Sequence, residues 1–466
     1  MMNFEYIIHL GIISLFLLVG ALLRTRVGFL QKFLIPSSII AGTLMLIFYN
    51  YIAPRLNLTA DFLGDLVYHL LNISFIATML RTSDKSRDKR KGVLAEGTVS
   101  IVAQYGLQCF LALLLVFILT KTIMPDLFPA IALTLPLGFE LGPGQAYSMS
   151  LPWESMGFEG ATSVGLCMAA IGFLVGSVGG VILINIGLKK GWVDKSIADK
   201  IKGSAGTGFL ARGKNGEAAY SKTESESIDS LTYHIALILF CYLLSWGLLT
   251  LLGVVLSPFG ALADELMNSL WGVNFIFSVF VASLVKMIMG RLDISYTIDN
   301  GTMNRINGLA VDLTVASSLG AISIVAIAHY WLPILLLSIL GIFITCFILP
   351  WYCSRLFKDY QFFRMLLLFG TATGTLPTGL ALLRVVDPEF ESPASTDYVY
   401  STSIVFFLVI PIILCANLPA YSYVQNRPEL MYLMMAITFA YTLACIIAYR
   451  ILAGKRAFQR GGLFLK

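Results

Sequence analysis

The chain is poor in charge and in the side chains that hold metals or build disulfide frameworks. Charged residues make up 13% of its 466 residues, whereas soluble domains carry about 25%. Only four histidines occur, and the seven cysteines are scattered without the paired spacing that a metal site or a set of disulfides needs. These absences argue against a soluble globular domain, a structural metal centre and a disulfide-stabilised fold.

What fills the sequence instead is apolar, because hydrophobic residues make up 57% of the chain. Long apolar runs recur, each near the length of about 20 residues that a hydrocarbon core requires. They predict spans near residues 5–23, 27–52, 62–80, 93–120, 161–188, 231–254, 265–290, 306–328, 332–352, 399–424 and 430–451. Arg24 and Arg26 follow the first run in place of a cleavage site, which favours a first span that is retained. We expect an all-α integral membrane protein with about eleven spans.

Two apolar stretches are interrupted by glycine and proline at corresponding places in the two halves of the chain. Residues 138–146 read GFELGPGQA and residues 370–378 read GTATGTLPT, so glycine occupies the first and fifth position of each. Pro143 and Pro377 remove backbone donors and break a helix. Matched broken segments are the best sequence pointer to the binding site of a transporter built from inverted repeats. The alternative is a pair of kinked helices that pack closely through their glycines.

The distribution of basic residues predicts the orientation. In the first half, basic residues follow the first span at Arg24 and Arg26 and cluster in 81–91, whereas the opposite loops of that half show only Arg55 and Lys121; a basic tail follows from 455 onward. By the positive-inside rule, the N-terminus lies outside, and the linker and C-terminus are cytoplasmic. Lys189 reaches the cytoplasm only if the first broken segment dips into the membrane and returns to the outside. Each half then has an odd number of crossings, so the two repeats have opposite orientation.

These observations divide the chain into four predicted parts. They are a first repeat at 1–188 with a re-entrant hairpin near 128–148, a linker at 189–230, a second repeat at 231–424 with a hairpin near 365–385, and an extra helix with a basic tail at 425–466. The linker is polar and rich in glycine and serine, as flexible connections are. Non-helical backbone at membrane depth is tolerated only beside protein or water, so we expect both hairpins to meet around a cavity.

At the broken segments the chain resembles the bacterial glutamate:sodium symporter family. The LGPGQ sequence at 141–145 stands where that family has a glycine-rich re-entrant motif, and GTLPTGLA at 374–381 resembles its Gly-x-x-Pro-Thr hairpin. The chain departs from the family at 143–145, where the family has His-Gly-Thr, and at Leu382, where it has asparagine. The resemblance implies two inverted five-span domains, a homodimer, elevator-like alternating access, and uptake of an amino-acid dicarboxylate with sodium.

The candidate residues for binding the solute and the ion lie in the broken segments and in nearby helices. They are Gly142, Gly144, Gln145, Thr373, Gly374, Thr375, Pro377, Thr378, Asp312 and Arg384. Sodium prefers oxygen ligands, which hydroxyls, amides and unwound carbonyls supply, while the N-termini of half-helices favour an anionic group.

Three ionisable residues have two interpretations each. Asp312 is a carboxylate inside a span, where charge is costly, so it either attracts the coupling ion or faces water at the helix mouth. Arg384 either offers a bidentate fork to a carboxylate or reaches the cytoplasmic surface and pairs with Asp387. Glu140, just before the first tip, either pairs with a cation or lies in an aqueous vestibule.

The sequence therefore predicts a sodium-coupled symporter of the inner cell membrane that imports glutamate or a related small organic anion. Its expected partners are the solute, the lipid bilayer and a second copy of the chain, with no nucleic acid and no cofactor beyond the coupling sodium. The alternatives are a proton-coupled carrier of another organic anion, a membrane-embedded enzyme and a channel. An enzyme needs catalytic groups that converge at one membrane face, and Asp65 with His69 is the nearest approach.

Overall fold

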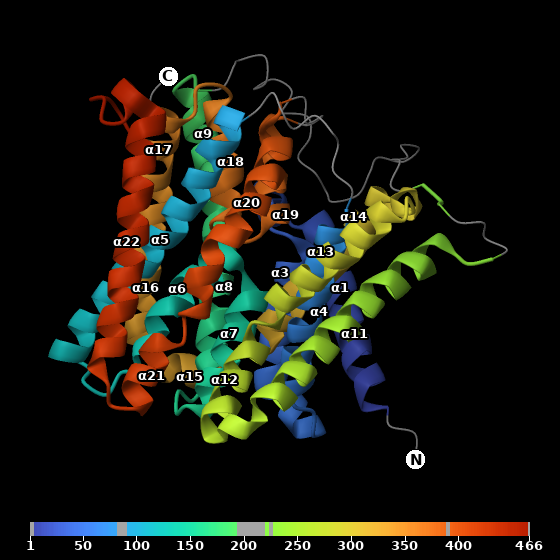
Figure 1. Ribbon diagram of the computed structural model, residues 1–466. Coiled ribbons are helices and arrows are strands. Elements are labelled where there is room, and N and C mark those ends of the chain that lie inside the picture. Colours follow the sequence, from blue (N-terminus) through green and yellow to red (C-terminus); the bar gives the residue numbers. More distant parts are fainter. Residues whose placement is uncertain (1–3, 82–90, 193–219, 223–226, 388–391, 465–466) are drawn as a thin grey trace.

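The computed structural model describes residues 4–81, 91–192, 220–222, 227–387 and 392–464. All regular elements in these ranges are helices, and ten helices there are long and apolar enough to cross a membrane. Figure 1 shows the C-terminus at the upper face of the molecule, whereas α1 (Glu5–Arg26) begins toward the lower face. The fold is that of an all-α, multi-pass membrane protein.

The two halves of the chain supply similar sets of helices. The first half contains α1 (Glu5–Arg26), α2 (Gly28–Lys32), α3 (Ser37–Ile47), α4 (Asp61–Leu80), α5 (Lys91–Thr122), α6 (Thr134–Pro136), α7 (Pro143–Ser155), α8 (Ala161–Leu174) and α9 (Gly180–Lys189). The second half contains α11 (Ser230–Leu256), α12 (Ala261–Gly272), α13 (Asn274–Arg291), α14 (Asn300–Gly320), α15 (Ile324–His329), α16 (Trp331–Phe343), α17 (Leu349–Leu356), α18 (Gln361–Thr371), α19 (Leu376–Val386), α20 (Ala394–Leu414), α21 (Leu418–Val424) and α22 (Pro428–Ala453).

Short turns of other helix types extend or join these elements. π-Helical turns lie at Phe48–Ile52, Leu137–Leu141, Val175–Gly179 and Ile344–Ile348, and 3-10 turns at Ala53–Leu56, Pro129–Leu133, Ser257–Phe259, Ser295–Thr297 and Gly454–Arg456. As a result, Pro129–Leu141, Ala161–Lys189 and Trp331–Leu356 are each one continuous helix.

Ten apolar spans replace the eleven predicted, because the segment expected at 306–328 is not one apolar helix. α14 begins earlier, where the Asp299 carboxylate accepts a hydrogen bond from the Thr302 amide at 2.7 Å, and it ends at Gly320. Its polar residues exclude it from the ten apolar helices. α3 and α4 cover much of α14, and a helix shielded by its neighbours needs no apolar surface all round.

The predicted span at 27–52, the predicted linker at 189–230 and the predicted last span at 430–451 differ in how well they match the structure. The span predicted at 27–52 begins only at Ser37, because Pro36 is extended and separates α2 from α3. The linker predicted at 189–230 lies largely outside the described residues, although its edges coincide with the end of α9 and the start of α11. The predicted last span at 430–451 is confirmed as α22, which is a few residues longer.

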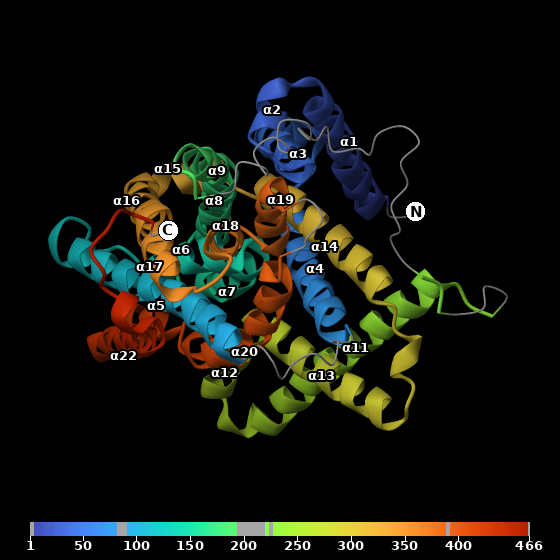
Figure 2. The same ribbon diagram turned by 90° about the horizontal axis from the view of Figure 1, so that it is seen from above.

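The spans form two bundles, sorted by their order in each half (Figure 2). The first bundle holds the first three long helices that pack together in each half: α1, α3 and α4 with α11, α13 and α14. The second bundle holds the remaining spans and the broken segments: α5 to α9, α16 to α20 and α22. α7 connects the two by packing against α4 and α14.

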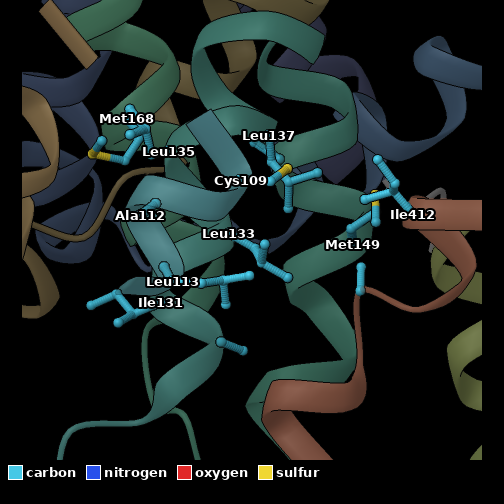
Figure 3. Close-up of a cluster of buried hydrophobic side chains, with 14 of the residues drawn as sticks. Cys109, Ala112, Leu113, Ile131, Leu133, Leu135, Leu137, Met149, Met168 and Ile412 are labelled. Carbon is cyan, nitrogen blue, oxygen red and sulfur yellow. The ribbon is translucent and has the colours of Figure 1, made fainter. Parts of the chain in front are cut away.

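The core of the second bundle is a cluster of buried apolar side chains around the first broken segment. Leu133 and Leu137 of that segment lie among Cys109 of α5, Met149 of α7 and Met168 of α8 (Figure 3). Because lipid tails are as apolar as leucine, such a core is stabilised in a membrane chiefly by close packing. The packing holds the segment rigidly against α5 and α8.

Candidate functional site

The first broken segment folds as two helices that join at Gly142. The arm Pro129–Leu141 ends in a π-helical turn, and α7 begins at Pro143. Gly142 has a φ of +85°, a left-handed conformation that glycine adopts without a steric penalty. Phe128, before the first arm, stacks on Phe158, after α7, with ring centroids 5.2 Å apart. Both ends of the segment therefore lie together, and the segment is a hairpin.

The second broken segment is a pair of packed helices, α18 and α19. Thr373 closes the C-terminus of α18 by donating its hydroxyl to the Phe369 carbonyl at 2.7 Å. α19 begins at Leu376 with Pro377 in its first turn, where a missing backbone amide carries little cost. The sequence predicts these segments near 128–148 and 365–385, and the helices that form them cover 129–155 and 361–386, so the first is longer at its C-terminal end and the second at both ends.

The tips of the two hairpins touch. A Cβ built on Gly142 would lie 3.2 Å from the Thr375 methyl carbon and 3.3 Å from the Gly374 carbonyl oxygen. α18 and α19 occupy the upper half of the molecule and α7 the lower half, so the hairpins approach each other from opposite faces (Figure 1). These contacts bring the two broken segments together at their tips.

Glycines of the helix Ala161–Lys189 form a cradle for the second tip. A Cβ at Gly172 would lie 2.8 Å from the Thr373 carbonyl oxygen, and a Cβ at Gly176 would lie 2.6 Å from the Thr373 hydroxyl. Gly138 of the first arm is equally tight, since its Cβ would lie 2.6 Å from the Ala169 amide nitrogen. Only glycine lets the backbones approach this closely.

Both returning helices begin at the tips without a side-chain cap. Neither Gly142 before α7 nor Thr375 before α19 provides a side-chain hydrogen bond to the first turn. Gln145 and Thr378, in those first turns, are each only 6% exposed. The first amides of a helix have no partner within it, and the helix dipole adds partial positive charge there. Two such ends close together suit an anionic group.

The remaining sequence candidates lie away from the tip contact. Gly144 faces α4, where a Cβ would come 2.5 Å from Leu71 Cδ1. Asp312 is an exposed residue of α14, in the other bundle, and its carboxyl interacts with the Ser38 hydroxyl of α3. Arg384 lies exposed in the last turn of α19, about 12 Å along the helix from its first residue. The structure thus gathers the hairpin candidates at the tips, whereas Asp312 belongs to α14 and Arg384 to the far end of α19.

Sequence reasoning missed a buried polar pair on α5. Gln104 and Gln108 are 1% and 0% exposed. Gln108 Nε2 donates to Glu140 Oε1 at 3.3 Å, and Gln104 Nε2 donates to the Thr345 hydroxyl at 3.4 Å. The available signal was two amides four residues apart in an otherwise apolar span, a spacing that puts both on one helix face.

A buried ion pair that the sequence did not predict ties the second hairpin to α20. Arg364 Nη1 of α18 lies 2.9 Å from Asp397 Oδ2, and both side chains are almost fully buried. Arg364 Nη2 also lies 3.2 Å from Asp359 Oδ1, which is half exposed. Burial strengthens such a pair and makes each partner dependent on the other.

No family model, curated protein or solved structure matches the chain. Its fold defines a class, the all-α multi-pass membrane proteins. Within that class, the two hairpins that meet at their tips are its most specific feature. The resemblance to glutamate:sodium symporters stays a prediction from sequence motifs.

Proposed function

We propose that this protein is a sodium-coupled secondary active transporter that imports glutamate or a related small organic anion without changing it chemically. The observation that carries the proposal is the contact of Gly142 with Gly374 and Thr375, which brings two uncapped helix N-termini together inside the protein. A helix that only packs gains nothing from such a break, whereas a solute site needs the freed amides.

The order and direction of the helices support two inverted repeats. α1 runs away from the lower face and α11 runs toward it (Figure 1), so the first spans of the two halves are opposed. In each half, three helices join the first bundle, and a further span, a hairpin and a last span join the second. Repeats of this kind give each membrane face an equivalent hairpin, which is the basis of alternating access.

The two bundles supply the parts that move in an elevator-like cycle. α7 packs on α4 where Gly64 lies beneath the Tyr147 ring and Gly144 lies on Leu71. Because glycine has no side chain, few side chains project from the surface between the two helices. We propose that the second bundle carries the solute as a unit past the first. The first bundle is proposed to form the homodimer, and Leu243 and Trp246 of α11 are 60% and 54% exposed on its apolar surface.

Uptake by purified protein in liposomes tests the proposal. An inward sodium gradient is expected to accelerate uptake of labelled glutamate or a dicarboxylate over a choline control of equal ionic strength. Gly142→Val serves as the inactive control, because its side chain collides with the second tip. Uptake that ignores both sodium and proton gradients for every solute would remove the coupling. Uptake driven by protons, with a pH dependence that Asp312→Asn abolishes, would favour the proton-coupled alternative.

A further inference from the structure

Glu140 is a carboxylate in the second bundle, and the described part of the chain supplies no basic side chain that pairs with it. It lies in the π-helical turn Leu137–Leu141, just before the tip residue Gly142. Among the described residues, no lysine, arginine or histidine forms an ion pair with it. A carboxylate at membrane depth is costly unless a proton or a cation accompanies it. The function proposed so far leaves this group unused.

Two buried amide oxygens lie on the helix that faces Glu140. Gln108 directs its NH2 group to Glu140 Oε1, which leaves Gln108 Oε1 buried with no hydrogen-bond partner among the residues that the structure describes. One helical turn earlier, Gln104 directs its NH2 group to Thr345, and within the described ranges Gln104 Oε1 also has no partner. A buried acceptor that is left unpaired destabilises the protein, because it loses its hydrogen bonds to water and gains none in return. Two such oxygens on one helix face, beside a carboxylate that only an amide contacts among the described residues, indicate a ligand that binds oxygen.

The backbone around this cluster adds negative potential. The arm Pro129–Leu141 ends at the carboxylate, and the last turn of a helix carries free carbonyl groups and the negative end of the dipole. Glu140 and Thr345 both lie in π-helical turns, Leu137–Leu141 and Ile344–Ile348. Such turns interrupt the regular hydrogen-bond pattern and are frequent at functional sites.

We infer that Glu140, Gln104 and Gln108 form a binding site for a hard monovalent cation, with sodium as the ion. Carboxylate, amide and carbonyl oxygens are the ligands that hard cations prefer, and one positive charge balances one carboxylate. The inference rests on the proposed function and deepens it. Sodium held at Glu140 fixes the turn that sets Gly142 against Thr375, so ion binding shapes the anion site.

Thermal unfolding of the purified protein detects the ion without any transport. Tm is recorded while NaCl replaces choline chloride at constant ionic strength, because a ligand of the folded state raises Tm with its concentration. Glu140→Gln is expected to raise the sodium Kd at least tenfold, and Gln104→Leu several-fold. Glu159→Gln, which changes an exposed acid in the loop after α7, is the matched control and keeps the wild-type Kd.

The outcomes separate the ion site from the transporter. A wild-type Tm that is equal in sodium and choline, or a Glu140→Gln protein with the wild-type Kd, overturns the site. If Glu140→Gln does not fold, Gln104→Leu decides, since it removes one oxygen and no charge. A sodium response that Glu140→Gln abolishes, in a protein that carries no anion, keeps the site and rejects the transporter. Sodium-driven uptake that survives Glu140→Gln keeps the transporter and rejects the ion site.

Discussion

Gly142 and Thr375 lie in contact, although one belongs to the hairpin of the lower half and the other to the hairpin of the upper half. Gly142 contributes only backbone to this contact, and its carbonyl accepts the first hydrogen bond of α7 from the Ala146 amide at 3.1 Å. The two tips therefore act as one unit, since a displacement of either backbone is felt directly by the other.

Gly142→Ala is expected to reduce uptake at least tenfold. The new Cβ meets the Thr375 methyl group, and a φ of +85° costs a residue with a side chain about 1–2 kcal/mol. Gly157→Ala is the matched control, because Gly157 has a φ of +97° with nothing within 4 Å of its Cβ. Uptake rates in liposomes decide the matter, and equal losses in both variants would assign the effect to backbone strain alone.

Asp397→Asn is expected to destabilise the protein by about 3–5 kcal/mol, because it leaves the buried Arg364 guanidinium without its closest carboxylate. Asp359→Asn removes the other partner, whose side chain is 52% exposed, and is expected to cost less than about 1 kcal/mol. Denaturant unfolding in detergent measures both. The anchoring role of the Arg364–Asp397 pair is refuted if the two variants unfold alike.

Gly172→Ala is expected to lower both Tm and uptake. Its Cβ would lie 2.8 Å from the Thr373 carbonyl oxygen, a backbone atom that moves only if the second tip moves. Gly308→Ala in α14 is the control, since nothing lies within 4 Å of that Cβ and alanine gains about 1 kcal/mol of helix propensity. We expect Tm to rise in the control, and a rise in both variants would contradict the cradle.

The pKa of Asp299 predicts a pH dependence of stability. Burial acts to raise the pKa of this carboxyl, but hydrogen bonds from Thr302 and from the Tyr220 amide outweigh it and hold the pKa below its ordinary value. The unfolded chain, with an aspartate pKa of about 3.9, therefore binds this proton more tightly. The stabilisation is complete above that pH and is lost as pH falls through the folded-state pKa.

Asp299→Asn measures this contribution directly. The Tm difference between wild type and variant is expected to be largest near neutral pH and to shrink on acidification below about pH 4. Asp264→Asn, an exposed aspartate of α12, is the control and should leave the pH profile unchanged. A wild-type advantage that grows on acidification would contradict the sign of the shift.

Cysteines introduced at Gln145 and Thr378 report the sidedness of the two hairpins. Each residue lies in the first turn of its returning helix, at the tip. We expect Gln145→Cys to react only with an impermeant reagent from outside and Thr378→Cys only from inside, with solute slowing both reactions. The parent protein, with its seven native cysteines, gives the background. Reaction of both positions from the same side would reject the opposed arrangement.

The broken segments show what can be predicted from the sequence alone. Proline cannot donate a backbone hydrogen bond and glycine accepts positive φ wherever they occur, so Pro143 and Gly142 were enough to predict a break. The structure has that break at Gly142 and a second one between α18 and α19. The same local signals do not say which residues of the two tips are in contact.

α14 shows what hydropathy cannot predict, namely where a polar helix begins and which of its residues are buried. The span expected at 306–328 begins instead at Asn300, because the Asp299 cap outweighs the polarity of the residues that follow it. The sequence predicts Asp312 as a charge inside that span that binds the coupling ion, yet its side chain is exposed. Glu140, in contrast, accepts a hydrogen bond from the buried Gln108. The burial of a side chain depends on how the whole bundle packs. The sequence pattern of one helix therefore cannot show which of the two carboxylates is more buried.

The sequence by itself determined that this is an all-α membrane protein and where two of its helices break, because composition and backbone stereochemistry act locally. Only the tertiary structure decided that Gly142 meets Thr375, that Gln108 donates to Glu140 and that Arg364 pairs with Asp397. Each of these contacts joins separate helices, and their separation in space is set by the packing of both bundles.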